Sequence, residues 1–130
     1  IYLREGTQAT FYNTIVSGPA GMGECLEVES NPVSQGHLQD GGISMTHSVM
    51  ACDNGENFKF GTSDVDLEQW FLGQQGNSVV TAAEALDGIF TATDAAAADL
   101  SGDTFFDNAD FVGAVSADND WTAGWTVGLE

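Results

Sequence analysis

The sequence predicts a mainly β fold, built from coils of a right-handed parallel β-helix with short helices and a C-terminal cap. Two similar segments carry this prediction: ATFYNTIVSG at 9–18 and ISMTHSVMAC at 43–52. Each holds one polar residue inside an apolar run, Asn13 in the first and His47 in the second, 34 positions apart. The 16 glycines and 2 prolines also favour many tight turns over long helices. At this offset the matched pairs are Phe11 with Met45, Thr14 with Ser48, Ile15 with Val49 and Val16 with Met50.

The polar residue at the centre of each segment predicts a bend in the chain. The apolar pairs 15–16 and 49–50 would break the alternation of a flat strand, whereas bends at Asn13 and His47 leave a short strand on either side. Asn tolerates left-handed backbone geometry, and its side chain can bond neighbouring backbone groups. Stacked coils would place Asn13 and His47 at the same inner bend. Because two coils are a weak repeat signal, a β-sandwich with two similar strands remains the alternative.

Residues 1–62 are expected to form the coils. Turn-rich loops are expected at 18–23 and 31–42. Coil one is assigned to the segments 1–6, 9–18 and 24–30, and coil two to 41–53 and 57–62.

Residues 63–130 are expected to switch to short helices, a final strand and a Trp-rich C-terminal cap. A cap is expected because an open β-helix exposes a sheet edge and a core layer. We expect it to form one structural unit with residues 1–62. The strand is predicted at 110–115, before DWTAGWTVGLE at 120–130. The helices are predicted at 63–73, between a Ser63 cap and Gly73; at 81–88, with a Thr81–Glu84 capping box and Gly88 at its end; and at 93–102, ending at Gly102.

The charge is extreme: 20 Asp and Glu residues stand against Arg4 and Lys59, a formal net charge of −18. Such a surface repels phosphate backbones and anionic lipids, so nucleic-acid and membrane partners are not expected. The chain has no run of 18 apolar residues, so membrane insertion is not expected either. High salt or divalent cations would screen this charge, which favours a marine or saline extracellular setting over ordinary acidic solubility.

Cys25 and Cys52 are the two cysteines of the chain. They form no C-x-x-C motif and have no neighbouring Cys or His that would suggest a metal site. If the chain is secreted, a single disulfide is expected, closing a loop of about 28 residues and contributing about 3.5 kcal/mol. The alternative is two unrelated buried thiols.

Three stretches resemble a known group of proteins: LREGTQATFYNTIVSG, CLEVE and, above all, FFDNADFVGAV with DWTAGWT. They resemble the C-terminal portion of large secreted β-helix proteins of marine and other Gram-negative bacteria, best over 1–29 and 104–126. The resemblance implies this fold and a secreted or outer-cell-surface location, and it carries no catalytic residues. Since the chain starts in a strand-like stretch without Met, we expect a mature or truncated C-terminal part.

No enzyme is expected in this segment. Polysaccharide lyases of β-helix fold use Arg or Lys with carboxylates, but Arg4 and Lys59 lie in different segments. A G-x-S-x-G motif is absent from the sequence. His47, although near Ser44 and Ser48, is expected to be a turn residue. His37, near Asp40, is expected to be solvated in a glycine-rich loop.

Calcium is the better chemical hypothesis. The stretch DLSGDTFFDNAD spaces its oxygens as an EF-hand-type loop does, at relative positions 1, 3, 5, 7, 9 and 12. Two departures are Thr104 where the loop needs Gly and an Asp at the last position. A solvated acidic loop is the alternative, and Asp118, Asn119 and Asp120 are a secondary candidate. The predicted ligands are Asp99, Ser101, Asp103, the carbonyl of Phe105, Asp107 and Asp110.

The sequence therefore predicts a non-enzymatic extracellular module, the end of a β-helix involved in surface display, adhesion or assembly and stabilised by Ca²⁺. Its expected partners are surface glycans, or further copies that associate through the β-helix ends. The alternative is the terminal segment of a polysaccharide lyase-like enzyme whose catalytic residues lie upstream. A carboxylate cluster with Arg or Lys on one coil face would favour that enzyme, and this segment lacks it.

Overall fold

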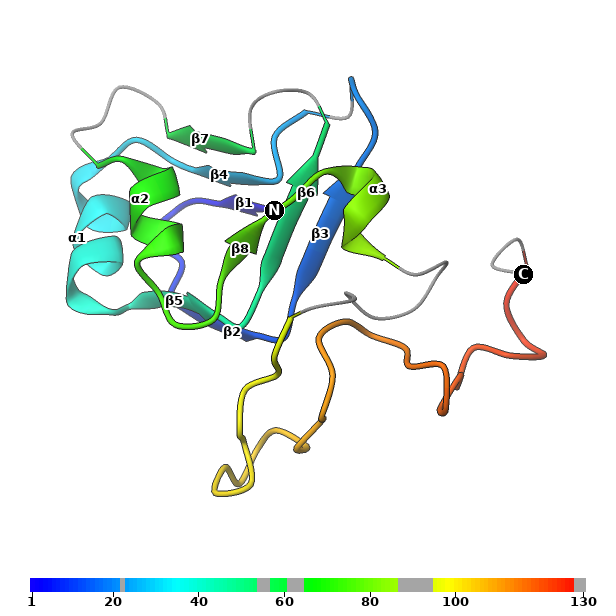
Figure 1. The fold of residues 1–130 in the computed structure, drawn as a ribbon. Helices are drawn as coiled ribbons and strands as arrows, with labels where there is room; N and C mark the ends of the chain where they lie inside the picture. Colours follow the sequence, from blue (N-terminus) through cyan, green and yellow to red (C-terminus); the bar gives the residue numbers. More distant parts are fainter. Residues whose placement is uncertain (22, 54–56, 61–64, 87–94, 128–130) are drawn as a thin grey trace.

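Short strands joined by tight bends form three parallel sheets (Figure 1) in the computed structural model, which describes residues 1–21, 23–53, 57–60, 65–86 and 95–127. Within these ranges the chain runs through the sheets in the same order and begins a third pass before residue 80. The mainly β character with parallel strands is therefore confirmed. The first sheet holds β1 (Tyr2–Leu3), β4 (Leu26–Val28) and β7 (Phe58–Phe60); the second, β2 (Ala9–Tyr12) and β5 (Ile43–Thr46); the third, β3 (Ile15–Gly18), β6 (Val49–Cys52) and β8 (Ser78–Val79).

The register between passes agrees with the 34-residue repeat. Phe11 lies opposite Met45, and Val16 lies opposite Met50. The predicted bends are also confirmed, because Asn13 separates β2 from β3 and His47 separates β5 from β6. Both residues have left-handed backbone geometry, with φ of 52° and 50°.

Asn13 and His47 lie at equivalent bends of adjacent passes, as predicted, because the register pairs Tyr12 with Thr46 and Ile15 with Val49. Asn13 Oδ1 accepts from Ala98 N at 2.8 Å, and the His47 ring lies against Gly76. The side chain that hydrogen-bonds the main-chain groups of each bend belongs to the residue that follows the bend. Ser48 Oγ accepts from Thr14 N at 3.2 Å and donates to the Thr46 carbonyl at 2.9 Å. The left-handed residue turns the chain, and the next residue supplies the hydrogen bonds.

Asn77 continues this polar row in the third pass. Its Oδ1 accepts from Ser48 N at 2.9 Å, and its Nδ2 donates to the carbonyls of Met45 at 2.7 Å and Phe71 at 2.8 Å. One amide side chain therefore satisfies three main-chain groups, two from the second pass and one from α2. Buried main-chain groups without such partners would be destabilising by about 1–3 kcal/mol each.

The core lies between the three sheets. Its fully buried large side chains include Leu26, Met45, Met50 and Phe71. All of β6 is buried, because β6 is the middle strand of its sheet and α3 (Ala82–Ala85) packs against it. Burial on both faces explains why residues 49–52 are continuously apolar instead of alternating.

The division into coils differs from the expected one. Residues 24–30 do not end the first coil, because β4 pairs with β1 in the first sheet. Likewise β7 pairs with β4, so residues 57–60 begin a third pass. Strand β8, which the sequence pattern did not indicate, continues that pass beside β6.

Residues 31–42, where a turn-rich loop is expected, contain a helix. Helix α1 (Pro32–Asp40) is capped by Asn31, whose Oδ1 accepts from the main-chain N–H groups of Val33 and Ser34. Proline suits the first helical position, and Gly41, with φ of 85°, suits the C-terminal cap. Because only Ser34 and Leu38 are buried, the helix has too weak an apolar pattern to be predicted from periodicity.

The other two helices lie within the predicted segments. Helix α2 (Leu67–Leu72) starts after Asp66, whose Oδ1 accepts from Gln69 N at 2.9 Å; the expected cap Ser63 lies outside the described residues. At α3 the Glu84 carboxylate accepts from the N–H and hydroxyl of Thr81, at 3.0 and 2.7 Å, as the capping box predicts. Gly88 lies outside the described residues.

Figure 1 shows α1 and α2 side by side, and Trp70 Nε1 of α2 donates to the Leu38 carbonyl at 3.0 Å.

The C-terminal part corrects two expectations. Residues 95–100 are not helical, and residues 110–115 form bends, not a strand. Short isolated helices are marginal in water, so one long-range contact can override local propensity. Two such contacts reach the first bend: Ala98 N bonds Asn13 Oδ1, and Gly113 N bonds the Asn13 carbonyl at 2.8 Å.

The C-terminal segment, residues 95–127, thus contacts the first pass. Besides the bonds to Asn13, the rings of Tyr12 and Phe106 meet edge to face at 5.4 Å. Trp121 and Trp125 are 52% and 66% exposed, so the predicted Trp-rich cap leaves its tryptophans largely in solvent. Among the described residues, no helix is long and apolar enough to cross a membrane.

Candidate functional site

The carboxylates predicted to hold calcium take part in local turns. Asp99 Oδ1 accepts from Ser101 N at 3.0 Å, and Asp103 Oδ1 accepts from the N–H groups of Phe105 and Phe106 at 2.7 and 3.0 Å. The Ser101 hydroxyl, and then its N–H, hold the pKa of Asp99 below its usual value; the N–H groups of Phe106 and Phe105 do the same to the pKa of Asp103. Both groups are therefore ionised at neutral pH.

These acids are exposed and do not converge. Asp107 and Asp110 belong to the same exposed stretch, and Asn108 Oδ1 holds Leu100 N at 2.8 Å. Across the described parts of the chain, no three His, Cys, Asp or Glu side chains are gathered closely enough to hold a metal ion. The calcium site stays a prediction.

Cys25 and Cys52 are joined by a disulfide, with the sulfurs 2.02 Å apart. Cys25 directly precedes β4 in the first sheet, and Cys52 ends β6 in the third. The bond therefore connects two of the three sheets at a corner of the core. Both residues belong to the central apolar cluster, so the bond is shielded from solvent.

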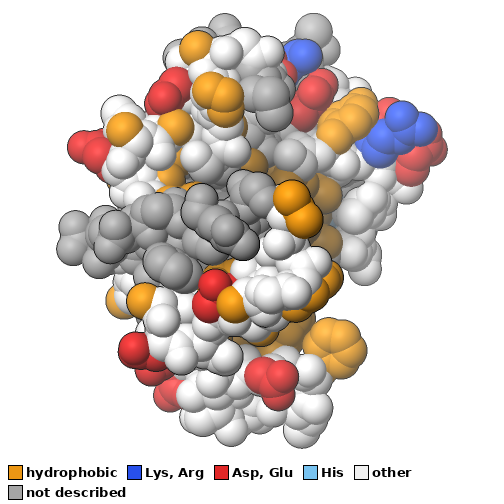
Figure 2. Space-filling model, turned by 90° about the vertical axis from the view of Figure 1, so that its right-hand side faces the viewer, with side chains coloured by type: hydrophobic (Ala, Val, Ile, Leu, Met, Phe, Trp, Pro, Cys, Tyr) orange, Lys and Arg blue, Asp and Glu red, His pale blue; other side chains and the backbone are white. Residues whose placement is uncertain are grey.

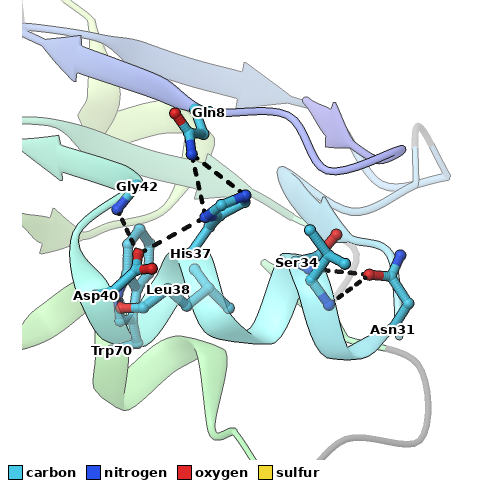
Figure 3. A network of polar contacts seen from close by, with 9 residues as sticks. Gln8, Asn31, Ser34, His37, Leu38, Asp40, Gly42 and Trp70 are labelled. Atoms are coloured by element: carbon cyan, nitrogen blue, oxygen red, sulfur yellow. Dashed lines mark hydrogen bonds and ion pairs between the residues drawn. The ribbon is translucent and has the colours of Figure 1, made fainter.

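His37 and His47 both have structural surroundings. Figure 3 shows His37 on α1 between Gln8 and Asp40, with its Nδ1 3.7 Å from Asp40 Oδ1 and its ring nitrogens 3.4–3.5 Å from Gln8 Nε2. Asp40 also accepts from Gly42 N at 2.9 Å, which fastens the end of α1 to β5. His37 is therefore packed against a helix end, not solvated in a loop as expected.

His47 and Ser48 do not form a catalytic pair. The Ser48 hydroxyl donates to Thr46 O, and the buried His47 Nδ1 has no hydrogen-bond partner within the part of the chain that the structure describes. The expected role of His47 as a turn residue agrees with its backbone geometry.

The two cationic side chains both belong to the first sheet or its end. Lys59 on β7 lies 3.5 Å from Glu27 and 3.8 Å from Glu24, and Arg4, just after β1, lies 3.8 Å from Glu5. Each cation is thus paired with carboxylates. On the face shown in Figure 2, Asp and Glu side chains are scattered widely, whereas Lys and Arg side chains are confined to the upper right.

A cleft of about 480 Å³ lies at the first bend. Residues of the bend and of β3 line one side: Asn13, Thr14, Ile15 and Ser17. The other side is lined by Leu86, Gly113 and Ala114. Local patterns could not indicate this cleft, because residue 13 and residues 98 and 113 meet only through tertiary contacts. The cleft combines an apolar lining with the main chain of a sheet edge, which suits binding. The described residues that line it include no titratable side chain.

A wider and more open cleft of about 830 Å³ lies at the opposite end of the third sheet, beside β8 and α3. Asp53 and Glu84 are among the residues that line it. Asp53 Oδ1 accepts from Ala82 N at 2.8 Å, and Glu84 is held by Thr81, so both carboxylates are occupied in positioning α3.

No protein-family model matches this sequence, and comparisons with curated proteins and with solved structures found no match. Function is therefore argued from the residues and their arrangement.

Proposed function

We propose that this chain is a non-enzymatic extracellular module, the end of a right-handed parallel β-helix that serves in surface display, adhesion or assembly. One observation carries the proposal: the chain passes through three parallel sheets in a fixed order, and two of the strand pairings repeat at the same 34-residue offset. Stacked passes of this kind build long, rigid supports whose sheet ends and side faces are available for contacts.

The charge supports the choice of partners. A net charge of −18 disfavours anionic partners and favours neutral or cationic ones, such as neutral surface glycans or basic protein segments. It also favours a setting in which salt or divalent cations screen the surface, as outside a marine cell. The proposed location is therefore secreted or on the outer surface of a bacterium.

The test separates binding from catalysis. The protein is incubated with neutral and acidic polysaccharides, and binding is measured by co-sedimentation while chain cleavage is followed through reducing ends and unsaturated products. We expect the protein to bind neutral polysaccharides without cleaving them. Protein that has been unfolded by reduction and heat should not bind.

Calcium-dependent cleavage of an acidic polysaccharide would contradict the proposal. It would favour the alternative of a polysaccharide lyase-like β-helix enzyme.

A further inference from the structure

Strand β3 is an edge strand with open main-chain groups. It pairs with β6 on one side, where Val49 N donates to Thr14 O at 2.8 Å and Asp53 N donates to Gly18 O at 3.0 Å. Main-chain groups of successive residues in a strand point to opposite sides, so those of Ile15 and Ser17 point away from β6. Over the described ranges, no hydrogen bond joins these groups to another residue.

The C-terminal segment occupies only the first position of this edge. The carbonyl of Asn13, at the bend just before β3, accepts from Gly113 N at 2.8 Å. The segment then turns away, because Gly113 has φ of 119° and Trp121 Nε1 holds the Ala114 carbonyl at 2.7 Å. The cleft of about 480 Å³ lies between β3 and the C-terminal segment, and Ile15 and Ser17 line it.

We infer that this cleft binds an extended, basic segment of a partner protein, which adds to the third sheet as a strand beside β3. Free main-chain donors and acceptors in a row bind another extended backbone, as in other cases of strand addition. This inference rests on the proposed assembly role, for which it names the partner.

The cleft also sets the composition of the partner segment. The apolar side chains of Ile15 and Leu86 line the cleft, and the half-buried Val16 packs against the core, so apolar side chains fit on both faces of an added strand. Charge selects the rest of the segment: Lys or Arg beside the apolar positions would complement a chain of net charge −18. A second copy of this chain would bring the same negative charge, which makes it the poorer occupant.

The probe is a synthetic peptide, KITVTVK, with blocked ends, added to the whole chain and followed by calorimetry and by amide hydrogen exchange. In the free protein we expect the amides of Ile15 and Ser17 to exchange faster than those of Val16 and Gly18. Saturating peptide should slow exchange at Ile15 and Ser17 about tenfold or more, the change expected for one new main-chain hydrogen bond.

Ser17→Pro is the decisive variant, because it removes an N–H that faces the cleft and leaves the bonds to β6 in place. We expect it to weaken peptide binding about tenfold or more. Thr10→Pro is the matched control. Since Ala9 N bonds Gly42 O across to β5, the Thr10 N–H also faces a free edge, but Thr10 does not line the cleft. Thr10→Pro should bind as the unchanged protein does.

Two backbone-methylated peptides keep the test valid if Ser17→Pro fails to fold. One carries N-methyl groups at positions 2, 4 and 6 of the peptide, and the other at positions 3 and 5. Strand addition predicts that one of the two loses binding and the other retains it.

Equal binding of both methylated peptides would overturn the inference, as would peptide binding that survives Ser17→Pro.

Two further results would assign the β3 edge to another occupant and contradict the inference. Slow amide exchange at Ile15 and Ser17 without peptide would assign the edge to the chain's own C-terminal segment. Dimerisation that Ser17→Pro abolishes would assign the edge to a second copy. A peptide that fails to bind while glycan binding persists contradicts this inference and leaves the proposed function standing.

Discussion

At the scale of single residues, the fold depends on a column of left-handed residues. Asn13, His47 and Gly76 occupy equivalent places before the strands of the third sheet, with φ of 52°, 50° and 71°. Left-handed geometry is unfavourable by about 1–2 kcal/mol for most residues with a Cβ, and less so for Asn. The bends are therefore determined by residue types that tolerate this geometry.

We expect Gly76→Ala to be strongly destabilising, and His47→Gly to relieve part of the effect. An added Cβ at Gly76 would lie 2.5 Å from His47 Cδ2, and the positive φ alone contributes about 1–2 kcal/mol. Removing the His47 ring removes the collision but not the backbone strain. Urea denaturation of the two single variants and the double variant would show a coupling between them.

Gly102→Ala is the control for this cycle, because an added Cβ there meets no atom within 4 Å and φ is not in the left-handed region. Strictly additive effects of the two substitutions would show that the His47 ring does not lie against Gly76.

At the scale of elements, strands of two to four residues cannot be stable alone, so links between them carry much of the fold. Asn77 and the disulfide are two such links. The first joins β5, the bend before β6 and α2 through main-chain groups, and the second joins the first and third sheets.

We expect replacement of both cysteines, Cys25→Ala with Cys52→Ala, to lower the free energy of unfolding by about 3 kcal/mol. The bond spans 27 positions of sequence, and its loss frees that loop in the unfolded chain. Denaturation with and without reductant measures the effect: reductant should destabilise the native protein and leave the double variant unchanged. Non-reducing peptide mapping that recovers two alkylatable thiols would contradict the disulfide.

At the scale of the whole molecule, the net negative charge is expected to destabilise the folded state through self-repulsion. With 20 acidic and 2 basic residues, and both basic side chains already paired with carboxylates, most of the negative charge is uncompensated. Added salt should stabilise the protein by screening, since the Debye length falls from about 8 Å at 0.15 M to about 3 Å at 1 M.

Calcium is predicted to stabilise the chain beyond this screening, through the loop from Asp99 to Asp110. At pH 7 the carboxylates of Asp99 and Asp103 are ionised, because hydrogen bonds lower the pKa of each. A specific site would add about 2.7 kcal/mol when Ca²⁺ exceeds its Kd a hundredfold. Thermal melts in millimolar CaCl₂ are compared with NaCl of equal ionic strength, and Asp103→Ala should abolish the difference.

Glu68→Ala is the control, since it removes an exposed charge far from this loop in sequence. Equal melting temperatures in the two salts would exclude the site. A calcium effect that survives Asp103→Ala would show that the calcium site lies elsewhere in the chain, with Asp118 and Asp120 as the next candidates.

Much of the strand framework was predictable from the sequence, because it depends on local patterns. The 34-residue repeat, the bends at Asn13 and His47 and the Thr81–Glu84 contact all follow from residues that are close in sequence or matched by a simple offset. Helix α1 has readable caps in Asn31 and Gly41, but its weak apolar face hid it.

Only the tertiary structure decided which sheet each strand joins, where residues 95–127 lie and that a cleft exists beside β3. Ala98 bonds Asn13 across 85 positions of sequence, and the alanine-rich stretch beside it is not helical. Local propensities in short segments are worth tenths of a kcal/mol per residue, so contacts between distant residues determine their final conformation.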